Sequence, residues 1–194
     1  MSVAFKSVSL SLVSCVLSLT TSHAVASVIT FESAVAPTSI RQVQPTTPYF
    51  EAGFAIRPTG IDSAIFGGLA SPMPGNPNSN WLGWAQNNVI QFDRVDGAAF
   101  SLTSALLGPG ATAVGPVSIT LNAFFQGGAT ANLTFANLST ATHSQINWTN
   151  LIRVDFLTTD NGGLDNLNVP SPSAAALLVF GGLFGTQRRR NATR

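Results

Sequence analysis

Alternation of apolar and polar residues with a period of two is the feature that most limits what this chain can fold into. It is clearest over residues 117–122 (VSITLN) and returns over residues 152–156 (IRVDF). A period of two is typical of a β-strand with one buried face and one hydrated face. The body of the chain is therefore expected to be built from strands.

Similar runs separated by turn-forming residues predict about eight short strands in all. The six further runs cover residues 28–31, 49–56, 89–92, 98–107, 129–135 and 164–169. Turn chemistry separates the runs at Asp96-Gly97, Gly108-Pro109-Gly110, Gly127-Gly128 and Asn161-Gly162-Gly163. No amphipathic helix is visible between them, which disfavours a parallel α/β fold. We expect an all-β fold, an antiparallel two-sheet sandwich that is jelly-roll-like.

The sequence allows a more specific structural prediction for two segments of this body. Residues 91–102 predict a hairpin in which Asp96-Gly97 forms the turn and Phe92 and Phe100 pack inward. Residues 71–80 (SPMPGNPNSN) form the longest polar loop, and we expect this loop to stay outside the core.

The first 26 residues have the layout of a secretory signal peptide, which is expected to be helical. Lys6 gives a positive start, residues 8–19 are apolar, and Ala24-Val25-Ala26 is a small-residue cleavage pattern. We expect cleavage after Ala26. An alternative is that Leu12-Val13-Ser14-Cys15 is a lipobox and that Cys15 is lipidated. Cys15 is the only cysteine, so the body can form no disulfide.

Residues 169–194 combine a helix breaker, an apolar segment and a basic stop. The breaker is Val169-Pro170-Ser171-Pro172, and the stop is the cluster Arg188, Arg189 and Arg190. Arginines stay on the cytoplasmic side of a membrane, which orients the body outward. The apolar segment, residues 174–185, is shorter than the ~20 residues of a standard span, so we expect a transient anchor. An ordinary C-terminal core helix is the alternative.

This tail resembles the PEP-CTERM sorting signal, also called the ice-binding protein C-terminal domain. The resemblance implies a short C-terminal apolar helix, transient anchoring in the inner membrane, and processing by an exosortase-type protease. It also implies release or attachment at the cell surface near exopolysaccharide. Ser171 stands where the family has Glu between two prolines. Residues 91–96 resemble the Gln-Phe-x-x-Asp stretch of some of these proteins, with Val95 at the Asp position.

These boundaries divide the chain into three parts. Residues 1–26 are the expected signal peptide, residues 27–168 the β-sandwich domain, and residues 169–194 the sorting tail. The middle part has four arginines against eight carboxylates and no lysine. An acidic body without a basic stripe disfavours nucleic acid as a partner.

Few residues of the body could carry catalysis. His143 is its one histidine, and no nucleophile motif accompanies it. The carboxylate pairs Asp93/Asp96 or Glu32/Glu51 could serve a glycoside hydrolase, but neither belongs to a recognisable motif. We therefore expect no enzyme, no catalytic residue and no required cofactor.

Oxygen-bearing side chains near both ends of the body predict a calcium site. The candidates are Glu32, Asp160, Asp165 and Asn166. The first and last strands of a jelly roll commonly lie side by side, so Glu32 and Asp165 could converge on one ion. The body also resembles carbohydrate-binding-module sandwiches at its start, Phe31-Glu32, and at its end, Leu164-Asp165-Asn166-Leu167. In those modules such positions hold a structural calcium. The alternative is that residues 160–166 only turn a hairpin.

Three aromatic residues are candidates for stacking on sugar rings. They are Tyr49, Trp81 and Trp84, with the loop before Trp81 as a rim. Ordinary core packing is the alternative. The leading hypothesis is a non-enzymatic exported surface or matrix protein associated with exopolysaccharide. A carbohydrate-binding module with structural calcium is the alternative, and a secreted glycoside hydrolase is the third.

Overall fold

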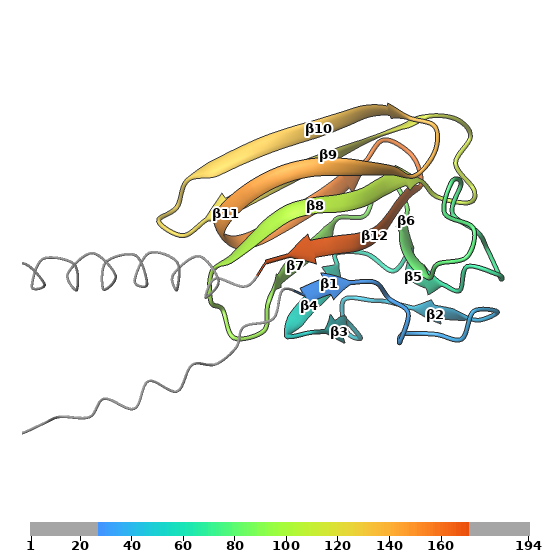
Figure 1. The fold of residues 1–194 in the computed structure, drawn as a ribbon, viewed down its shortest axis with the longest axis horizontal. Helices are drawn as coiled ribbons and strands as arrows, with labels where there is room; N and C mark the ends of the chain where they lie inside the picture. Colours follow the sequence, from blue (N-terminus) through green and yellow to red (C-terminus); the bar gives the residue numbers. More distant parts are fainter. Residues whose placement is uncertain (1–26, 171–194) are drawn as a thin grey trace, which may run out of the picture.

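The computed structural model describes residues 27–170, and all of their regular structure is β-strand (Figure 1). The expected all-β fold is confirmed. Within these residues, no helix is long and apolar enough to cross a membrane. The helices expected at the two termini, the expected cleavage site and most of the sorting signal (Ser171, Pro172, Arg188, Arg189 and Arg190) lie outside the described residues.

Twelve antiparallel strands in the described residues form two layers that share one long strand. The first layer has the order β2 (Ile40–Gln42), β5 (Ser63–Phe66), β6 (Trp81–Trp84), β12 (Gly162–Val169), β8 (Phe100–Pro109) and the first half of β11 (Thr142–Thr158). β1 (Ser27–Ile29) pairs with the end of β12. The second layer has the order β10 (Thr130–Leu138), β9 (Val117–Phe125), the second half of β11, β7 (Ile90–Arg94), β4 (Phe54–Pro58) and β3 (Tyr49–Glu51).

β11 passes from one layer to the other because two bulges bend it. Its pairing with β8 shifts register between Gln145 and Trp148 and again between Trp148 and Leu151. Asn147 and Asn150 lie in these intervals with φ of 57° and 58°. Asparagine tolerates the left-handed region better than most residues, and a bulge bends its strand. The alternation over residues 142–151 is broken for this reason, so the sequence predicted only the second half of the strand.

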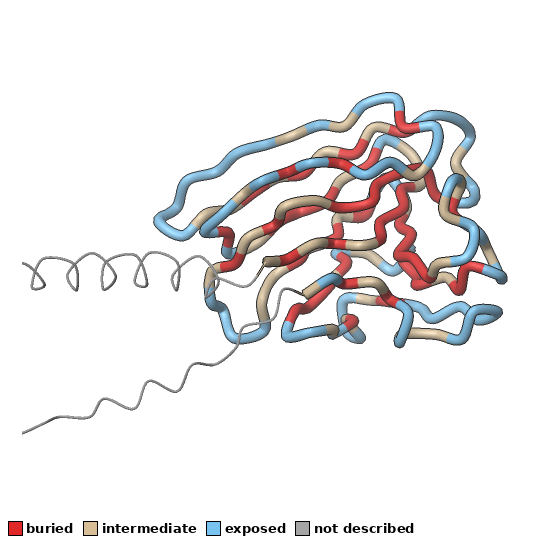
Figure 2. The backbone as a smooth tube through the Cα atoms, viewed as in Figure 1, coloured by how far each residue is buried: buried red, intermediate tan, exposed pale blue. Residues whose placement is uncertain are grey.

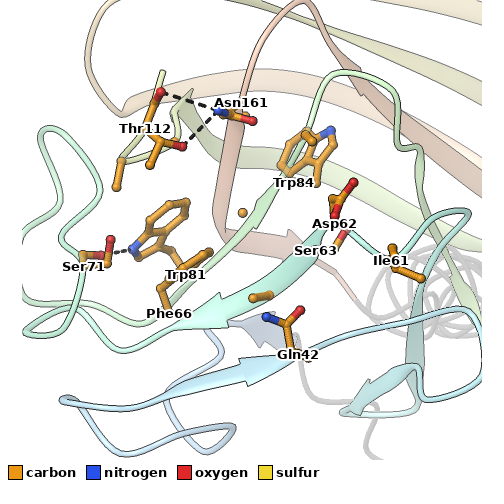
Figure 3. Close-up of a pocket in the computed structure, with 16 residues that line it drawn as sticks. Gln42, Ile61, Asp62, Ser63, Phe66, Ser71, Trp81, Trp84, Thr112 and Asn161 are labelled. Atoms are coloured by element: carbon orange, nitrogen blue, oxygen red, sulfur yellow. Dashed lines mark hydrogen bonds between the residues drawn. The ribbon is translucent and has the colours of Figure 1, made fainter. Parts of the chain in front are cut away.

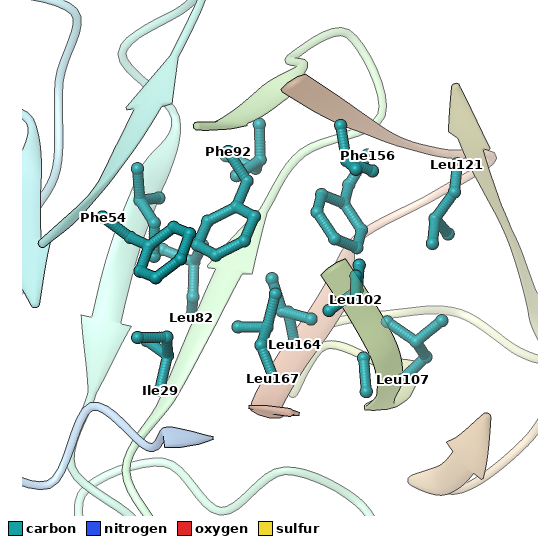
Figure 4. Close-up of a cluster of buried hydrophobic side chains, with 14 of the residues drawn as sticks. Ile29, Phe54, Leu82, Phe92, Leu102, Leu107, Leu121, Phe156, Leu164 and Leu167 are labelled. Carbon is teal, nitrogen blue, oxygen red and sulfur yellow. The ribbon is translucent and has the colours of Figure 1, made fainter. Parts of the chain in front are cut away.

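The core fills the space between the layers (Figure 4). Phe54 and Phe92 stack with ring centroids 4.9 Å apart, and Phe100 meets Phe92 edge-on at 5.4 Å. The inward packing of Phe92 and Phe100 is confirmed. The predicted hairpin is wrong, because β7 pairs with β4 and β11 whereas β8 pairs with β11 and β12. The turn at Asp96-Gly97 instead leads from one layer to the other.

The polar loop at residues 71–80 packs more deeply than expected. Met73 and Asn80 are 0% and 1% exposed. The Met73 methyl group lies 2.8 Å and 3.0 Å from the positions that a Cβ would take at Gly163 and Gly108. Glycines at these two positions therefore make room for a side chain from the loop.

The first and last strands lie side by side, as expected for this fold. Ser27 lies opposite Val169, and Ile29 lies opposite Leu167. Val169, which we assigned to the tail, is the last residue of β12 and is buried. The two ends of the described fold therefore meet at one edge of the sandwich (Figure 1).

Candidate functional site

A cleft of about 230 Å³ opens where β5 and β6 meet two turns, at residues 110–112 and 161–162 (Figure 3). We call it the Trp81 cleft. Its aromatic lining consists of Phe66, Trp81 and Trp84. Its polar side chains are Gln42, Asp62, Ser63, Ser71, Thr112 and Asn161. The structure thus brings two of the three predicted aromatic residues to one cleft.

The sequence of β6, Trp-Leu-Gly-Trp, explains how the cleft wall forms. Alternation along the strand places Trp81 and Gly83 on one face. Trp81 stacks on Phe66 with centroids 4.7 Å apart, and its Nε1 donates a hydrogen bond of 2.7 Å to the Ser71 carbonyl. A Cβ at Gly83 would lie 2.8 Å from both rings. The aromatic pair therefore depends on glycine at this position.

Trp84 lies on the opposite face of β6 from Trp81, with Leu82 in the core, and neither indole is an exposed platform. Trp81 and Trp84 are 1% and 2% exposed. The Trp84 Nε1 and the Thr158 Oγ1 are buried without a hydrogen-bond partner among residues 27–170. A Cβ at Gly162 would lie 2.9 Å from the Trp84 ring and 3.1 Å from that oxygen. The Trp84 ring and one unsatisfied hydroxyl group, that of Thr158, therefore flank a glycine that lines the cleft.

The rim of the cleft is polar and contains no cationic side chain among its described lining residues. Asn161 Nδ2 donates a hydrogen bond of 2.9 Å to Thr112 Oγ1, which joins the two turns (Figure 3). Gln42, Asp62 and Thr112 are exposed. The cleft therefore offers amide and hydroxyl groups and one carboxylate beside an aromatic wall.

Tyr49, the third predicted aromatic residue, is not part of this cleft. It lies on β3 at the edge of the other layer, packed against Phe31 with ring centroids 5.7 Å apart. Its hydroxyl donates a hydrogen bond of 2.9 Å to Glu51 Oε2. Burial raises the pKa of Tyr49. The side chain is a packing residue with a satisfied hydroxyl.

Glu32 and Asp165 converge on one hydroxyl group. Ser79 Oγ lies 2.6 Å from Glu32 Oε1 and 2.7 Å from Asp165 Oδ2. A serine hydroxyl has one proton and can donate it to only one of these oxygens at a time. The second short contact therefore requires a proton on one carboxyl group or a cation between them. Desolvation raises the pKa of the fully buried Asp165 to about 6, and the charge of Glu32 adds to this effect.

Asn166 belongs to this cluster and Asp160 does not. The Asn166 amide donates a hydrogen bond of 2.7 Å to Asp165 Oδ1, and Asn166 itself has a φ of 48°. Asp160 instead accepts hydrogen bonds from the amides of Val114, at 3.0 Å, and Asn161, at 2.8 Å. It stabilises the turn beside the Trp81 cleft. The four predicted calcium ligands are therefore divided between two places.

The polar loop supplies contacts to this cluster that the sequence reasoning missed. Asn76 Nδ2 donates a hydrogen bond of 2.8 Å to Asp165 Oδ2. The Asn80 amide donates one of 3.1 Å to Glu32 Oε1, and its side chain donates to the carbonyls of Phe31, Glu32 and Val35. The density of Asn and Ser in residues 71–80 was the available signal for this role.

No group of three or more His, Cys, Asp and Glu side chains that could hold a metal occurs in residues 27–170. The Glu32–Asp165 cluster has two carboxylates. Its other donors are hydroxyl, amide and carbonyl oxygens, which calcium also accepts. The donor chemistry suits calcium rather than a metal that requires nitrogen or sulfur.

The residues considered for hydrolysis are engaged elsewhere. Asp93 forms an ion pair with Arg57, and Asp96 forms one with Arg94. Glu51 accepts hydrogen bonds from the amides of Thr30 and Phe31 and from the Tyr49 hydroxyl. His143 is exposed on β11. These contacts give Asp93, Asp96 and Glu51 structural roles.

The fold and the site define an antiparallel β-sandwich with an aromatic-walled cleft. No family model matches the chain, and no curated protein matches it. One similar solved structure is TmCBM61 in complex with β-1,4-galactotriose, at 10% identity and a TM-score of 0.38. That match covers 62% of this chain and 89% of the other.

A second similar structure is the M60 catalytic domain with the CBM51-1 and CBM51-2 domains from Clostridium perfringens ZmpB. It is 8% identical with a TM-score of 0.34, and the match covers 69% of this chain and 15% of that one. Both likenesses are too distant to assign a function. The functional argument therefore depends on the cleft and the carboxylate cluster.

Proposed function

We propose that this chain is an exported, non-enzymatic β-sandwich that binds glycan in the Trp81 cleft. The observation that carries the proposal is the lining, which combines three aromatic residues with hydroxyl and amide groups and the Asp62 carboxylate. Binding sites commonly combine an apolar wall with a few polar groups that fix orientation. The cleft is smaller than the roughly 300–1,000 Å³ of drug-sized sites, so it suits one sugar ring of a longer chain.

The unsatisfied Trp84 Nε1 supports a polyhydroxylated ligand. A buried donor without an acceptor costs roughly 1–3 kcal/mol. A sugar hydroxyl, or a water held by one, would remove that cost if it reached the indole N–H of Trp84.

Tryptophan fluorescence tests this function, because Trp81 and Trp84 both line the cleft. The protein is titrated with neutral oligosaccharides, including fragments of the exopolysaccharide of its own host. We expect saturable binding that Asn161→Ala weakens at least threefold, since this change removes the rim amide. Gln145→Ala, an exposed amide on β11, is the matched control. The proposal fails if no oligosaccharide binds, or if both variants bind as the parent does.

We also propose that the Glu32–Asp165 cluster binds calcium in a structural role. Calcium would take the place of the shared proton between the two carboxylates, and Asn76 and Asn80 support the loop around them. We expect calcium to raise the Tm more than magnesium does. Asp165→Asn should abolish the difference, whereas Asp160→Asn, whose carboxylate caps a separate turn, should retain it. An equal effect of the two ions on the parent protein would refute the site.

Delivery to the cell surface is the remaining part of the proposal, and it depends on the two termini. The leader supports export, and the tail supports transient inner-membrane anchoring followed by exosortase-type processing. Intact-mass analysis of protein from its native host tests both ends at once. We expect loss of residues 1–26 and a shortened tail. A lipid on Cys15, or a tail retained through Arg194, would contradict the corresponding step.

A further inference from the structure

β10 forms a long sheet edge with no strand beyond it in the described part of the chain. It has nine residues and pairs with β9 alone. Figure 1 shows β10 on the outer rim of its layer, and Figure 2 shows that much of it is exposed. The edge strands β1, β2 and β3 have three residues each. The unpaired edge of β10 is therefore long enough to receive another strand.

The backbone groups that face this edge follow from the hairpin register. The Phe125 amide donates a hydrogen bond of 2.9 Å to the Ala129 carbonyl. Hydrogen-bonded and non-hydrogen-bonded pairs alternate along an antiparallel ladder. The amides and carbonyls of Thr130, Asn132 and Thr134 therefore point away from β9. Pairing with β9 is regular from Thr130 to Phe135, so these groups form one straight row.

Over Thr130–Phe135, β10 lacks the devices that usually protect such an edge, since its one register shift lies beyond this stretch, between Phe135 and Leu138. Natural edge strands carry charges, prolines or bulges that prevent pairing with another chain. Residues 97–152 contain no Asp, Glu, Lys or Arg, and β10 contains no proline. The first half of β11, which pairs with β8 alone, is protected by its two bulges. β2 and β3 are short and contain Arg41 and Glu51.

We propose that β10 pairs with β10 of a second copy of this chain, antiparallel and about a two-fold axis. The register that uses all three edge-facing residues is centred on Asn132. It places Asn132 opposite Asn132, and Thr130 opposite Thr134 on both sides of the axis. A two-fold axis places the same residues of the two copies close together. Any charged residue near the axis would therefore lie opposite the same charge in the second copy. The absence of charge removes that repulsion.

Similar polar pairs already occur between β10 and β9 within one molecule. Asn132 lies opposite Asn122, and Thr134 lies opposite Thr120 with their hydroxyl oxygens 2.9 Å apart. The Asn–Asn and Thr–Thr pairs that the dimer requires are therefore pairs that this sheet already accommodates. Leu133, half-buried at the rim of the core, would lie opposite Ala131 of the second copy and gain apolar cover. The backbone bonds and this cover together favour a dimer.

Sedimentation analysis of the full chain tests the proposal with two matched variants. Asn132→Lys places two like charges opposite each other at the axis, which destabilises strand pairing. Asn122→Lys adds the same charge one strand inward and disrupts the same Asn pair. We expect the parent and Asn122→Lys to dimerise at micromolar concentration. Asn132→Lys should raise the dimer Kd at least tenfold.

Thr134→Pro is a second variant that keeps the test decisive if Asn132→Lys fails to fold. The Thr134 amide faces the edge, so proline removes a bond to the second copy and none to β9. Circular dichroism establishes that each variant is folded. A parent that stays monomeric up to about 0.1 mM would overturn the proposal. Equal weakening by Asn132→Lys and Asn122→Lys would also overturn it, because the sheet face would then be the interface. A dimer that Asn132→Lys and Thr134→Pro both leave unchanged would refute it too.

Discussion

At the scale of single residues, Asp165 is a carboxyl group whose surroundings favour its neutral form. Burial raises its pKa from 3.8 to about 6. The protonated form is favoured in the folded state, so its stabilising effect is complete below about pH 4 and is lost as the pH rises through 6. In EDTA, we expect the free energy of unfolding to fall by roughly 2 kcal/mol between pH 4 and pH 7 from this group.

Denaturant unfolding of the protein and of Asp165→Asn across this pH range measures the effect. Asparagine has nearly the same shape and does not ionise, so the variant should lose most of this slope. It should also be more stable than the parent at pH 7 in EDTA. If the slope is the same in both proteins, Asp165 does not titrate as described, and other groups cause the pH dependence.

Gly83 is a second residue with a predicted effect on stability, because one added carbon atom would disturb the stack of Phe66 on Trp81. A Cβ would lie 2.8 Å from both Phe66 and Trp81, so Gly83→Ala must displace one ring. We expect a cost of about 1–3 kcal/mol in unfolding free energy, as for other overpacked sites, and a change in tryptophan fluorescence. Gly60→Ala is the control, because its Cβ would meet only the side chain of Asn88 at 3.3 Å. Equal costs for the two variants would show that the stack adapts freely.

At the scale of strands, the bulges of β11 determine how the two layers are joined. Asn147 and Asn150 are both exposed, so their side chains contribute little packing. Their left-handed backbone costs other non-glycine residues about 1–2 kcal/mol. Asn147→Ala and Asn150→Ala should each destabilise the fold by about 1 kcal/mol, while Asn147→Gly should be close to neutral. Chemical denaturation measures these changes.

Gln145→Ala is the control for the bulge, since this residue is exposed on the same strand and does not have a positive φ. Its effect should stay within about 0.5 kcal/mol. If Gln145→Ala costs as much as Asn147→Ala, then loss of the side chain, and not backbone strain, explains the result.

The strands also show what the sequence could predict. Clean alternation located β9 and the second half of β11 because a period of two survives wherever one face is buried. The run at residues 49–56 was predicted as one strand, but Ala52 and Gly53 adopt φ of 50° and 82° and divide it. β2, β5 and β6 have too few residues for a period to be visible.

Local turn chemistry could not reveal which strands pair. Asp96-Gly97 is compatible with a hairpin and with a crossing between layers, and only the complete sandwich selects the second. The same limit applies to the site. Trp81 and Trp84 are close in sequence and meet in one cleft, whereas Tyr49 was assigned to them without knowledge of strand order. The contacts of Ser79 with Glu32 and Asp165 span 47 and 86 residues, beyond any local signal.

At the scale of the whole molecule, pairing of the first and last strands closes the fold. Ser27 lies opposite Val169, so a short linker could join the two ends of the described domain. Val114 is 95% exposed, and a Cβ at Gly115 would meet nothing within 4 Å. A circular permutant opened between residues 114 and 115 keeps every strand intact and should fold. We expect cooperative unfolding with a free energy within about 2 kcal/mol of the parent.

A permutant opened inside β11, between Val154 and Asp155, is the matched control. Both residues are buried and pair with β7 and β9, so this opening breaks the strand that the two layers share. It should give no cooperative transition by circular dichroism. If both permutants fold equally well, continuity of β11 is not what joins the layers. If neither permutant folds, β1 and β12 do not tolerate a direct connection. Their pairing would then require that the two chain ends stay unlinked.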